Sequence, residues 1–142
     1  LKKLDMRFAL FLSIVFFMTS CDKDPGEGGT SSINGEVYKI FTFQNPNTGN
    51  WDTSYYQLDA GKDVFIIYSD NQSEIYDDKF ETDYNGRYHF EYLRNGNYTI
   101  YTYADSTDAS NVRYDYPVFR NIKITSSNSI MTAKDFVIEE NQ

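Results

Sequence analysis

The sequence predicts an all-β protein with one sandwich domain, and three observations favour this class. From residue 33 onward, apolar and polar side chains alternate in short segments separated by turn-forming residues. All 13 tyrosines follow Cys21, and many alternate with polar residues, which is typical of strands. No stretch after Cys21 is rich in alanine or leucine, so we expect no helix there.

Seven segments are expected to be strands of this sandwich. Residues 62–68 are apolar on both faces, which predicts a central strand. The expected strands are residues 33–43, 62–68, 74–82, 87–92, 97–103, 114–125 and 131–138. Polar loops are expected at residues 44–50, 69–73 and 104–111, and tight turns at Asn85-Gly86 and Asn95-Gly96.

The alternation also predicts the core. Tyr88, Phe90 and Tyr92 share one face of their expected strand. Asp83 is placed to accept hydrogen bonds from the amides of the following turn. Tyr101 and Tyr103 face away from the interior, where we expect an outer aromatic ladder. The side chains expected in one core are Tyr88, Phe90, Leu93, Tyr98 and Ile100.

Residues 1–20 are expected to be a signal peptide. Arg7 precedes an apolar run of 11 residues at positions 8–18, too short to cross a bilayer of about 30 Å as a helix. The segment from Met18 to Cys21 resembles a lipobox, with methionine in place of the usual leucine. That resemblance implies diacylglyceryl transfer to the Cys21 thiol and cleavage before it, so that acyl chains anchor the protein.

Residues 21–32 are expected to be a flexible tether, because they are polar and rich in glycine and serine. The Lys/Asp-rich start of this segment resembles the export signal of Bacteroidetes surface lipoproteins. In enterobacteria, aspartate directly after the cysteine would instead imply retention in the inner membrane. We expect the first location, lipid-anchored at the outer membrane or cell surface.

The charge of the chain excludes some partners. The net charge is −8, and removal of residues 1–20 takes away three basic residues and one acidic residue, which leaves −10. Such a surface repels nucleic acid and anionic lipid headgroups, so we expect no nucleic-acid partner and membrane attachment only through Cys21.

The segment from Thr82 to Ile100 carries a known pattern. It reads Thr-Asp-x-x-Gly-x-aromatic-x-Phe-x-x-Leu-x-x-Gly-x-Tyr-x-aliphatic, with every position met. This resembles the prealbumin-like sandwich of carboxypeptidase regulatory-like domains and adhesin B repeats, and the resemblance spans about residues 33–138. It implies a seven-stranded antiparallel, transthyretin- or Ig-like sandwich in residues 33–142 and says little about function.

The sequence predicts no enzyme, no cofactor and no metal site. His89 is the single histidine, and alternation turns it outward, so no nucleophile–base set can be assembled. The acidic residues of segment 70–78 lack EF-hand spacing. Adhesin B repeats often carry an isopeptide bond, for which Lys39 and Asp135 are the candidate pair. Thr102 occupies the position of the family's glutamate, which argues against the bond.

Trp51, Tyr55 and Tyr56 are the candidate ligand-binding residues. They lie in the long first connection, residues 44–60, which we expect to be a polar loop. Exposed aromatic rings there could stack on sugars or fill a partner's pocket, and the alternative is that they cap the sandwich. The sequence therefore predicts a non-enzymatic binding or accessory module for an envelope protein or a glycan. The alternative is a structural spacer or adhesin-like subunit of a larger surface assembly.

Overall fold

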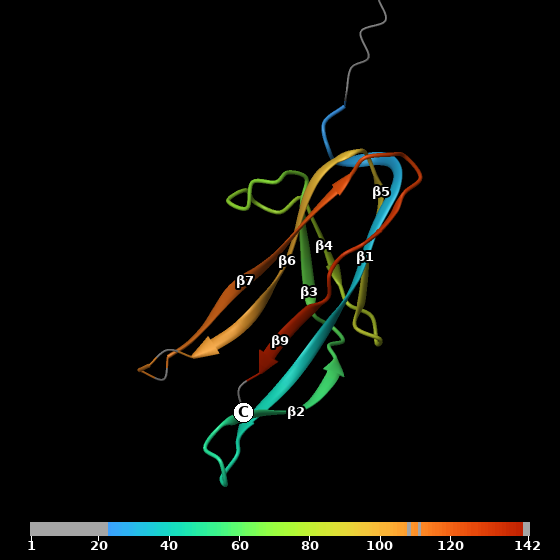
Figure 1. Cartoon of the computed structure of the whole chain (residues 1–142). Coiled ribbons are helices and arrows are strands. Elements are labelled where there is room, and N and C mark those ends of the chain that lie inside the picture. Colours follow the sequence, from blue (N-terminus) through green and yellow to red (C-terminus); the bar gives the residue numbers. More distant parts are fainter. Residues whose placement is uncertain (1–22, 108, 111, 141–142) are drawn as a thin grey trace, which may run out of the picture.

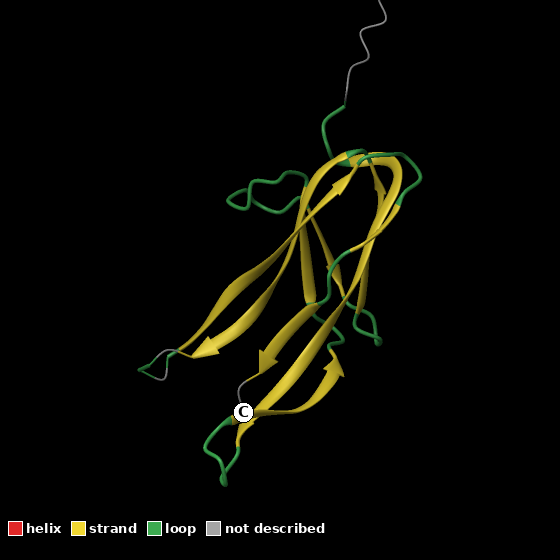
Figure 2. Cartoon of the chain, in the orientation of Figure 1, coloured by secondary structure: helices red, strands yellow, loops and turns green. Residues whose placement is uncertain are grey.

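The computed structural model describes residues 23–140 except 108 and 111, with only the backbone described at 54, 55 and 140. The predicted signal peptide and Cys21 lie outside the described residues. Within them the protein is all-β with no helix, and therefore with no helix that could cross a membrane (Figures 1 and 2). The strands are β1 Glu27–Gln44, β2 Trp51–Leu58, β3 Asp63–Ile67, β4 Asp78–Glu81, β5 Arg87–Leu93, β6 Gly96–Thr107, β7 Arg113–Ile124, β8 Ile130–Thr132 and β9 Phe136–Glu140.

The strands form two sheets that enclose a common core. One sheet has four antiparallel strands in the order β4-β3-β6-β7, which confirms β3 as a central strand. The other has five strands arranged around β1. Strand β1 pairs antiparallel with β2 and β5, and parallel with β8 and β9. The expected seven-stranded, purely antiparallel arrangement is therefore wrong in strand number and in direction at β8 and β9.

The expected tether is shorter than residues 21–32, because β1 already begins at Glu27. The polar composition of this segment does not prevent it from forming a strand, because the hydrogen bonds between strands are made by the backbone. A Cβ at Gly29 would lie 2.0 Å from the Leu93 carbonyl oxygen, so the close approach to β5 requires glycine. Just before the strand, the Gly26 carbonyl accepts a hydrogen bond from the Arg94 amide at 2.9 Å.

The first connection is also more ordered than a polar loop. Residues Trp51–Leu58 form β2, which returns along β1 as a hairpin. The Asn45 amide donates to the Asn50 carbonyl at 2.8 Å and closes the turn. Two smaller expectations also change, since β6 continues to Thr107 and the expected strand 131–138 is divided into β8 and β9.

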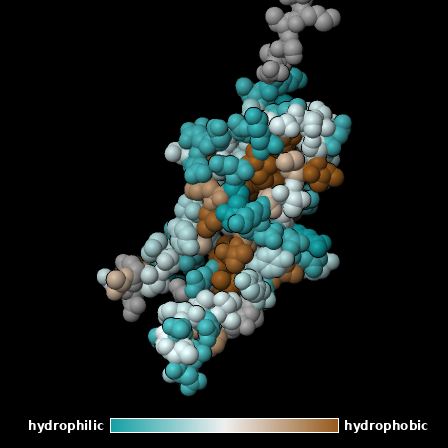
Figure 3. Space-filling view, in the orientation of Figure 1, coloured by the Kyte–Doolittle hydropathy of each residue, from teal (hydrophilic) through white to brown (hydrophobic). Residues whose placement is uncertain are grey.

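The core contains the five predicted side chains, all buried: Tyr88, Phe90, Leu93, Tyr98 and Ile100. Tyr92 differs from the prediction and is 69% exposed. Its φ of 59° is left-handed, which interrupts the alternation and turns Leu93 inward in its place. Figure 3 shows hydrophobic residues along the middle of this side of the molecule, where the interior between the sheets meets the surface.

Tyr98 joins the core to the start of β1. Its hydroxyl donates to the Arg94 carbonyl at 2.7 Å and accepts from the Gly26 amide at 3.0 Å. The ring is fully buried, so loss of the hydroxyl leaves both backbone groups without this partner.

We expect Tyr98→Phe to lower the free energy of unfolding by about 1–3 kcal/mol, measured by denaturant titration. Tyr92→Phe is the matched control, because the Tyr92 side chain is exposed, and it should change stability by less than about 0.5 kcal/mol. Equal effects of the two variants would contradict the anchoring role of the Tyr98 hydroxyl.

Candidate ligand-binding face

The outer face of the five-stranded sheet is set by alternation along β1. Ile33, Gly35 and Val37 are buried. The intervening side chains of Asn34, Glu36 and Tyr38 therefore point away from the core. Arg87 of β5 pairs with Glu36 and lies on the same outer face.

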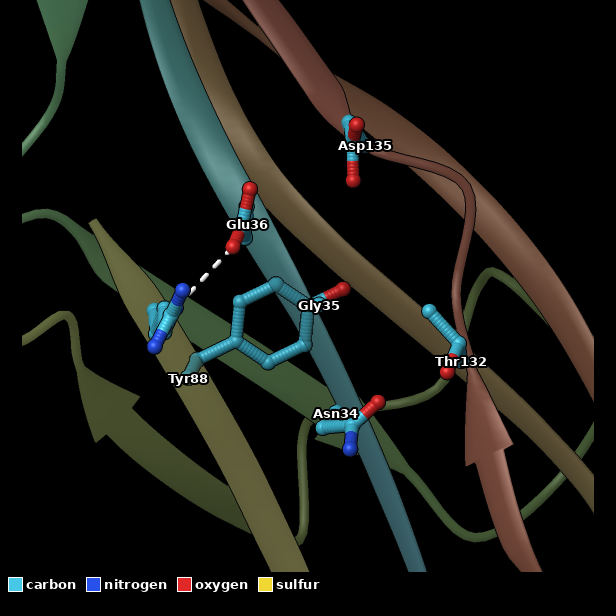
Figure 4. A pocket seen from close by; sticks show the side chains of 7 residues that line it. Asn34, Gly35, Glu36, Tyr88, Thr132 and Asp135 are labelled. Atoms are coloured by element: carbon cyan, nitrogen blue, oxygen red, sulfur yellow. Dashed lines mark hydrogen bonds and ion pairs between the residues drawn. The ribbon is translucent and has the colours of Figure 1, made fainter. Parts of the chain in front are cut away.

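A pocket of about 440 Å³ opens on this face, between β1, the start of β5 and the β8–β9 connection. Pairing of β1 with β8 ends at Asn34 and Thr132, and pairing with β9 begins at Val37 and Phe136. Two residues of β1 therefore face three residues of the connection, and the sheet is open between them (Figure 4). The lining residues are Asn34, Gly35, Glu36, Arg87, Tyr88, Thr132 and Asp135.

The Tyr88 hydroxyl lies at the inner end of this opening. Tyr88 pairs with Gly35, and its ring crosses β1 at that residue, so that a Cβ on Gly35 would lie 2.4 Å from the hydroxyl oxygen. In Figure 4 the hydroxyl points toward the gap between β1 and the segment from Thr132 to Asp135. The side chain is 1% exposed, yet the hydroxyl has no hydrogen-bond partner among the described residues.

The Tyr88 hydroxyl remains a hydrogen-bond donor at any physiological pH. Burial raises the pKa of Tyr88 above its ordinary value, and the negative charge of Asp135 raises it further. A buried donor without an acceptor is costly, so an acceptor group entering the pocket would be stabilised there.

The rim of the pocket presents mainly acceptors. Glu36 accepts hydrogen bonds from the Tyr38 hydroxyl and from Arg87 Nε, the latter at 3.0 Å. These two donors lower the pKa of Glu36, so its carboxylate is ionised at neutral pH. Asp135 supplies a second carboxyl group and Asn34 an amide. Two carboxylates with one guanidinium favour a ligand that donates hydrogen bonds and carries no negative charge.

An apolar strip adjoins the pocket on the same face. In the backbone register, Leu58 of β2 and Val137 of β9 flank Tyr38, and Tyr56 of β2 lies opposite Ile40. Opposite residues point to the same side of a sheet, so these side chains form one surface. The apolar strip comprises Tyr38, Ile40, Tyr56, Leu58 and Val137, and Tyr56 is 65% exposed.

A β-bulge brings Trp51 onto the same face as Tyr56. Phe41 pairs with Tyr55, but the next residue, Thr42, pairs with Thr53, which leaves one extra residue in β2. Trp51 therefore lies opposite Gln44, on the side of β1 that also carries Ile40. Trp51 is 68% exposed, so Trp51 and Tyr56 do not fit the alternative in which these aromatic residues cap the sandwich. The Tyr55 side chain lies outside what the structure describes.

The remaining sequence candidates lie apart from this face or are engaged elsewhere. His89 is exposed, as predicted, and its ring packs on Phe80 at 4.4 Å between centroids. Lys39 forms an ion pair with Asp59 at 3.4 Å. Lys39 is in register with Ile138, three positions beyond Asp135, which does not bring the proposed isopeptide pair together. Within the described part of the chain, no three His, Cys, Asp or Glu side chains are grouped to hold a metal ion.

The comparisons with known proteins identify no family. No family model matches the chain, and no curated protein matches it. Among solved structures, the chain is similar to a protein of Pseudomonas aeruginosa described as a "putative carbohydrate binding protein". The identity is 15%, the TM-score is 0.43, and the match covers 81% of this chain and 91% of that one. Neither the fold family nor the ligand of this chain follows from a similarity at that level.

We expect Tyr88→Phe to leave the free energy of unfolding unchanged within about 0.5 kcal/mol or to raise it, because the hydroxyl makes no hydrogen bond within the protein. Tyr88→Ala should lower it by about 3–5 kcal/mol through loss of the buried ring. Thermal unfolding of the two variants checks this. A loss above about 1 kcal/mol in Tyr88→Phe would show that the hydroxyl has an acceptor inside the protein.

Proposed function

We propose that this protein is a non-enzymatic, glycan-binding lipoprotein of the cell envelope, and that it binds sugar on the outer face of its five-stranded sheet. The observation that carries the proposal is the buried, unpartnered Tyr88 hydroxyl at the inner end of a polar pocket. The apolar strip next to this pocket completes the surface.

Sugar chemistry fits both parts of this face. Hydroxyl groups of a neutral sugar can donate to the carboxylates of Glu36 and Asp135 and can accept from Tyr88. The apolar side of a pyranose ring packs on exposed aromatic rings, which Tyr56 and Trp51 provide. The volume is within the range of about 300–1,000 Å³ for small-ligand pockets.

We also propose that the sandwich is prealbumin-like and that the protein has no enzymatic activity. Asp83 accepts hydrogen bonds from the amides of Asn85 and Arg87 at 2.8 and 2.9 Å, as expected for the turn of the family pattern. The buried Tyr88, Phe90, Leu93, Tyr98 and Ile100 are the apolar positions of that pattern. His89 packs on Phe80, and the proposal of a non-enzymatic role rests on the sequence, in which His89 is the single histidine.

The proposed cellular location is based on the signal-peptide-like sequence of residues 1–20. The proposed orientation at the membrane is based on where the described chain enters the sandwich. We place the protein at the outer membrane or cell surface, attached through acyl chains on Cys21. The described chain enters the sandwich at one end of the molecule, and the β1–β2 hairpin lies at the opposite end (Figure 1). The hairpin and its aromatic residues would thus point away from the membrane.

The alternative is a structural spacer or adhesin-like subunit of a larger surface assembly. The observation that favours it is the 12-residue edge strand β7, which among the described strands pairs with β6 alone, so that its other edge is open to a partner strand. An edge of this kind joins proteins through backbone pairing and does not require the pocket or the apolar strip.

Glycan-array binding separates these two functions. We expect the protein to bind at least one neutral glycan, with affinity reduced about tenfold in Tyr88→Phe, Trp51→Ala and Tyr56→Ala, or about 1.4 kcal/mol each. Tyr114→Ala, on the other sheet, is the control and should retain affinity. Binding that is indifferent to all three substitutions, or no binding to any glycan, would contradict the proposal and favour the structural role.

Anchoring is tested by metabolic labelling with radioactive palmitate in a bacterial host. We expect label on the protein and its recovery in the membrane fraction, both lost in Cys21→Ser. Ser20→Ala keeps a small residue before the cysteine and should remain labelled. An unlabelled parent chain would mean that the lipobox-like segment is not processed as one.

A further inference from the structure

The end of the molecule where the chain enters the sandwich contains a second pocket, of about 350 Å³. The start of β1, the β5–β6 turn and the β7–β8 turn meet there (Figure 1). Its lining residues are Lys23, Gly28, Gly29, Thr30, Leu93, Arg94, Asn95 and Ser127. The pocket is therefore built from four separate stretches of the chain.

The charge of this pocket is opposite to that of the protein. Of the lining residues that the structure describes, the ionisable ones are Lys23 and Arg94, in a chain of net charge −8. Among the residues described, neither cation has a carboxylate within ion-pair distance. Elsewhere, Lys79 pairs with Asp63, Arg87 with Glu36 and Arg113 with Asp105. Lys23 and Arg94 thus line one cavity without a carboxylate partner among the described residues.

The backbone holds Arg94 in place while leaving a donor unused. The Arg94 amide donates to the Gly26 carbonyl at 2.9 Å, and Nη1 donates to the Asp24 carbonyl at 3.4 Å. The guanidinium packs against Gly28, where a Cβ would lie 2.9 Å from Nη2. Nε is buried and has no hydrogen-bond partner in the described part of the chain. A positioned guanidinium with an unused N–H suits an anion with several acceptor oxygens.

We propose that this pocket binds a phosphate group, with Arg94 and Lys23 as its charged contacts. Phosphate presents several oxygens to the guanidinium donors, and the hydroxyls of Thr30 and Ser127 line the same cavity. Lys23 is two residues after Cys21, a span of about 7 Å at most. If Cys21 carries the acyl chains proposed above, phospholipid headgroups are the nearest source of phosphate. A free phosphate ion is the other source.

The test uses the full chain with Cys21→Ser, so that no acyl chain contributes. It is titrated with inorganic phosphate and, separately, with water-soluble dihexanoyl phosphatidylglycerol, with binding followed by calorimetry and by the amide resonances of Gly28 and Gly29. We expect saturable binding that weakens at least tenfold in Arg94→Gln and several-fold in Lys23→Gln. Arg113→Gln removes a cation that is paired with Asp105 at the far hairpin and serves as the control.

The outcomes are distinct. Binding of both probes with loss in Arg94→Gln supports the site and the headgroup source, and binding of inorganic phosphate alone supports the site with the free ion as source. No saturable binding, or affinity unchanged in both Arg94→Gln and Lys23→Gln, overturns the proposal. Arg94→Lys keeps the charge and should lose affinity less than Arg94→Gln, and circular dichroism verifies that each variant is folded. The proposed glycan site is lined by other residues, so a failure to bind phosphate would not contradict the glycan proposal, and the reverse also holds.

Discussion

Backbone pairing along β1 is the constraint on which the larger sheet depends. β5 and β8 pair with its first half, and β2 and β9 pair with its second half. Val37 lies at the change of partner on one edge, since its amide donates to Gly86 at 2.8 Å and its carbonyl accepts from Asp59 at 2.9 Å. On the other edge the change occurs across Gly35 and Glu36, and the mismatch in residue number there opens the pocket. The candidate site therefore results from the pairing of the single strand β1 with four other strands.

The two sheets differ in how their outer aromatic side chains are used. On the four-stranded sheet, the predicted ladder is present: Tyr101 stacks on Phe65 at 5.0 Å between centroids and packs against Phe119 at 5.3 Å. Tyr101 is buried beneath these rings, and Tyr103, the other ring of the ladder, is 40% exposed. On the five-stranded sheet, Trp51 and Tyr56 remain largely exposed. This contrast is why the proposed ligand surface is placed on the five-stranded sheet.

Alternation in the sequence predicts the central strands and the core, because burial of one strand face depends on side chains that the sequence displays directly. It does not predict β2, whose residues Asp52, Thr53 and Gln57 resemble a loop although their backbone pairs with β1. Alternation places Tyr92 in the core, which is wrong, because the left-handed backbone at Tyr92 interrupts the alternation and Leu93 points inward instead. The pocket is beyond prediction for a different reason: it depends on the register between β1 and a connection about 100 residues later.

The length of β1 has a mechanical consequence. Its 18 residues have a contour length of about 55 Å and join the end of the molecule near Lys23 to the turn that precedes Trp51. A pull between these two ends runs along the strand, whereas the hydrogen bonds to β2 and β5 lie across it. Because β1 is already extended, its covalent backbone carries that tension from one end of the sandwich to the other, and the hydrogen bonds to the neighbouring strands do not bear it.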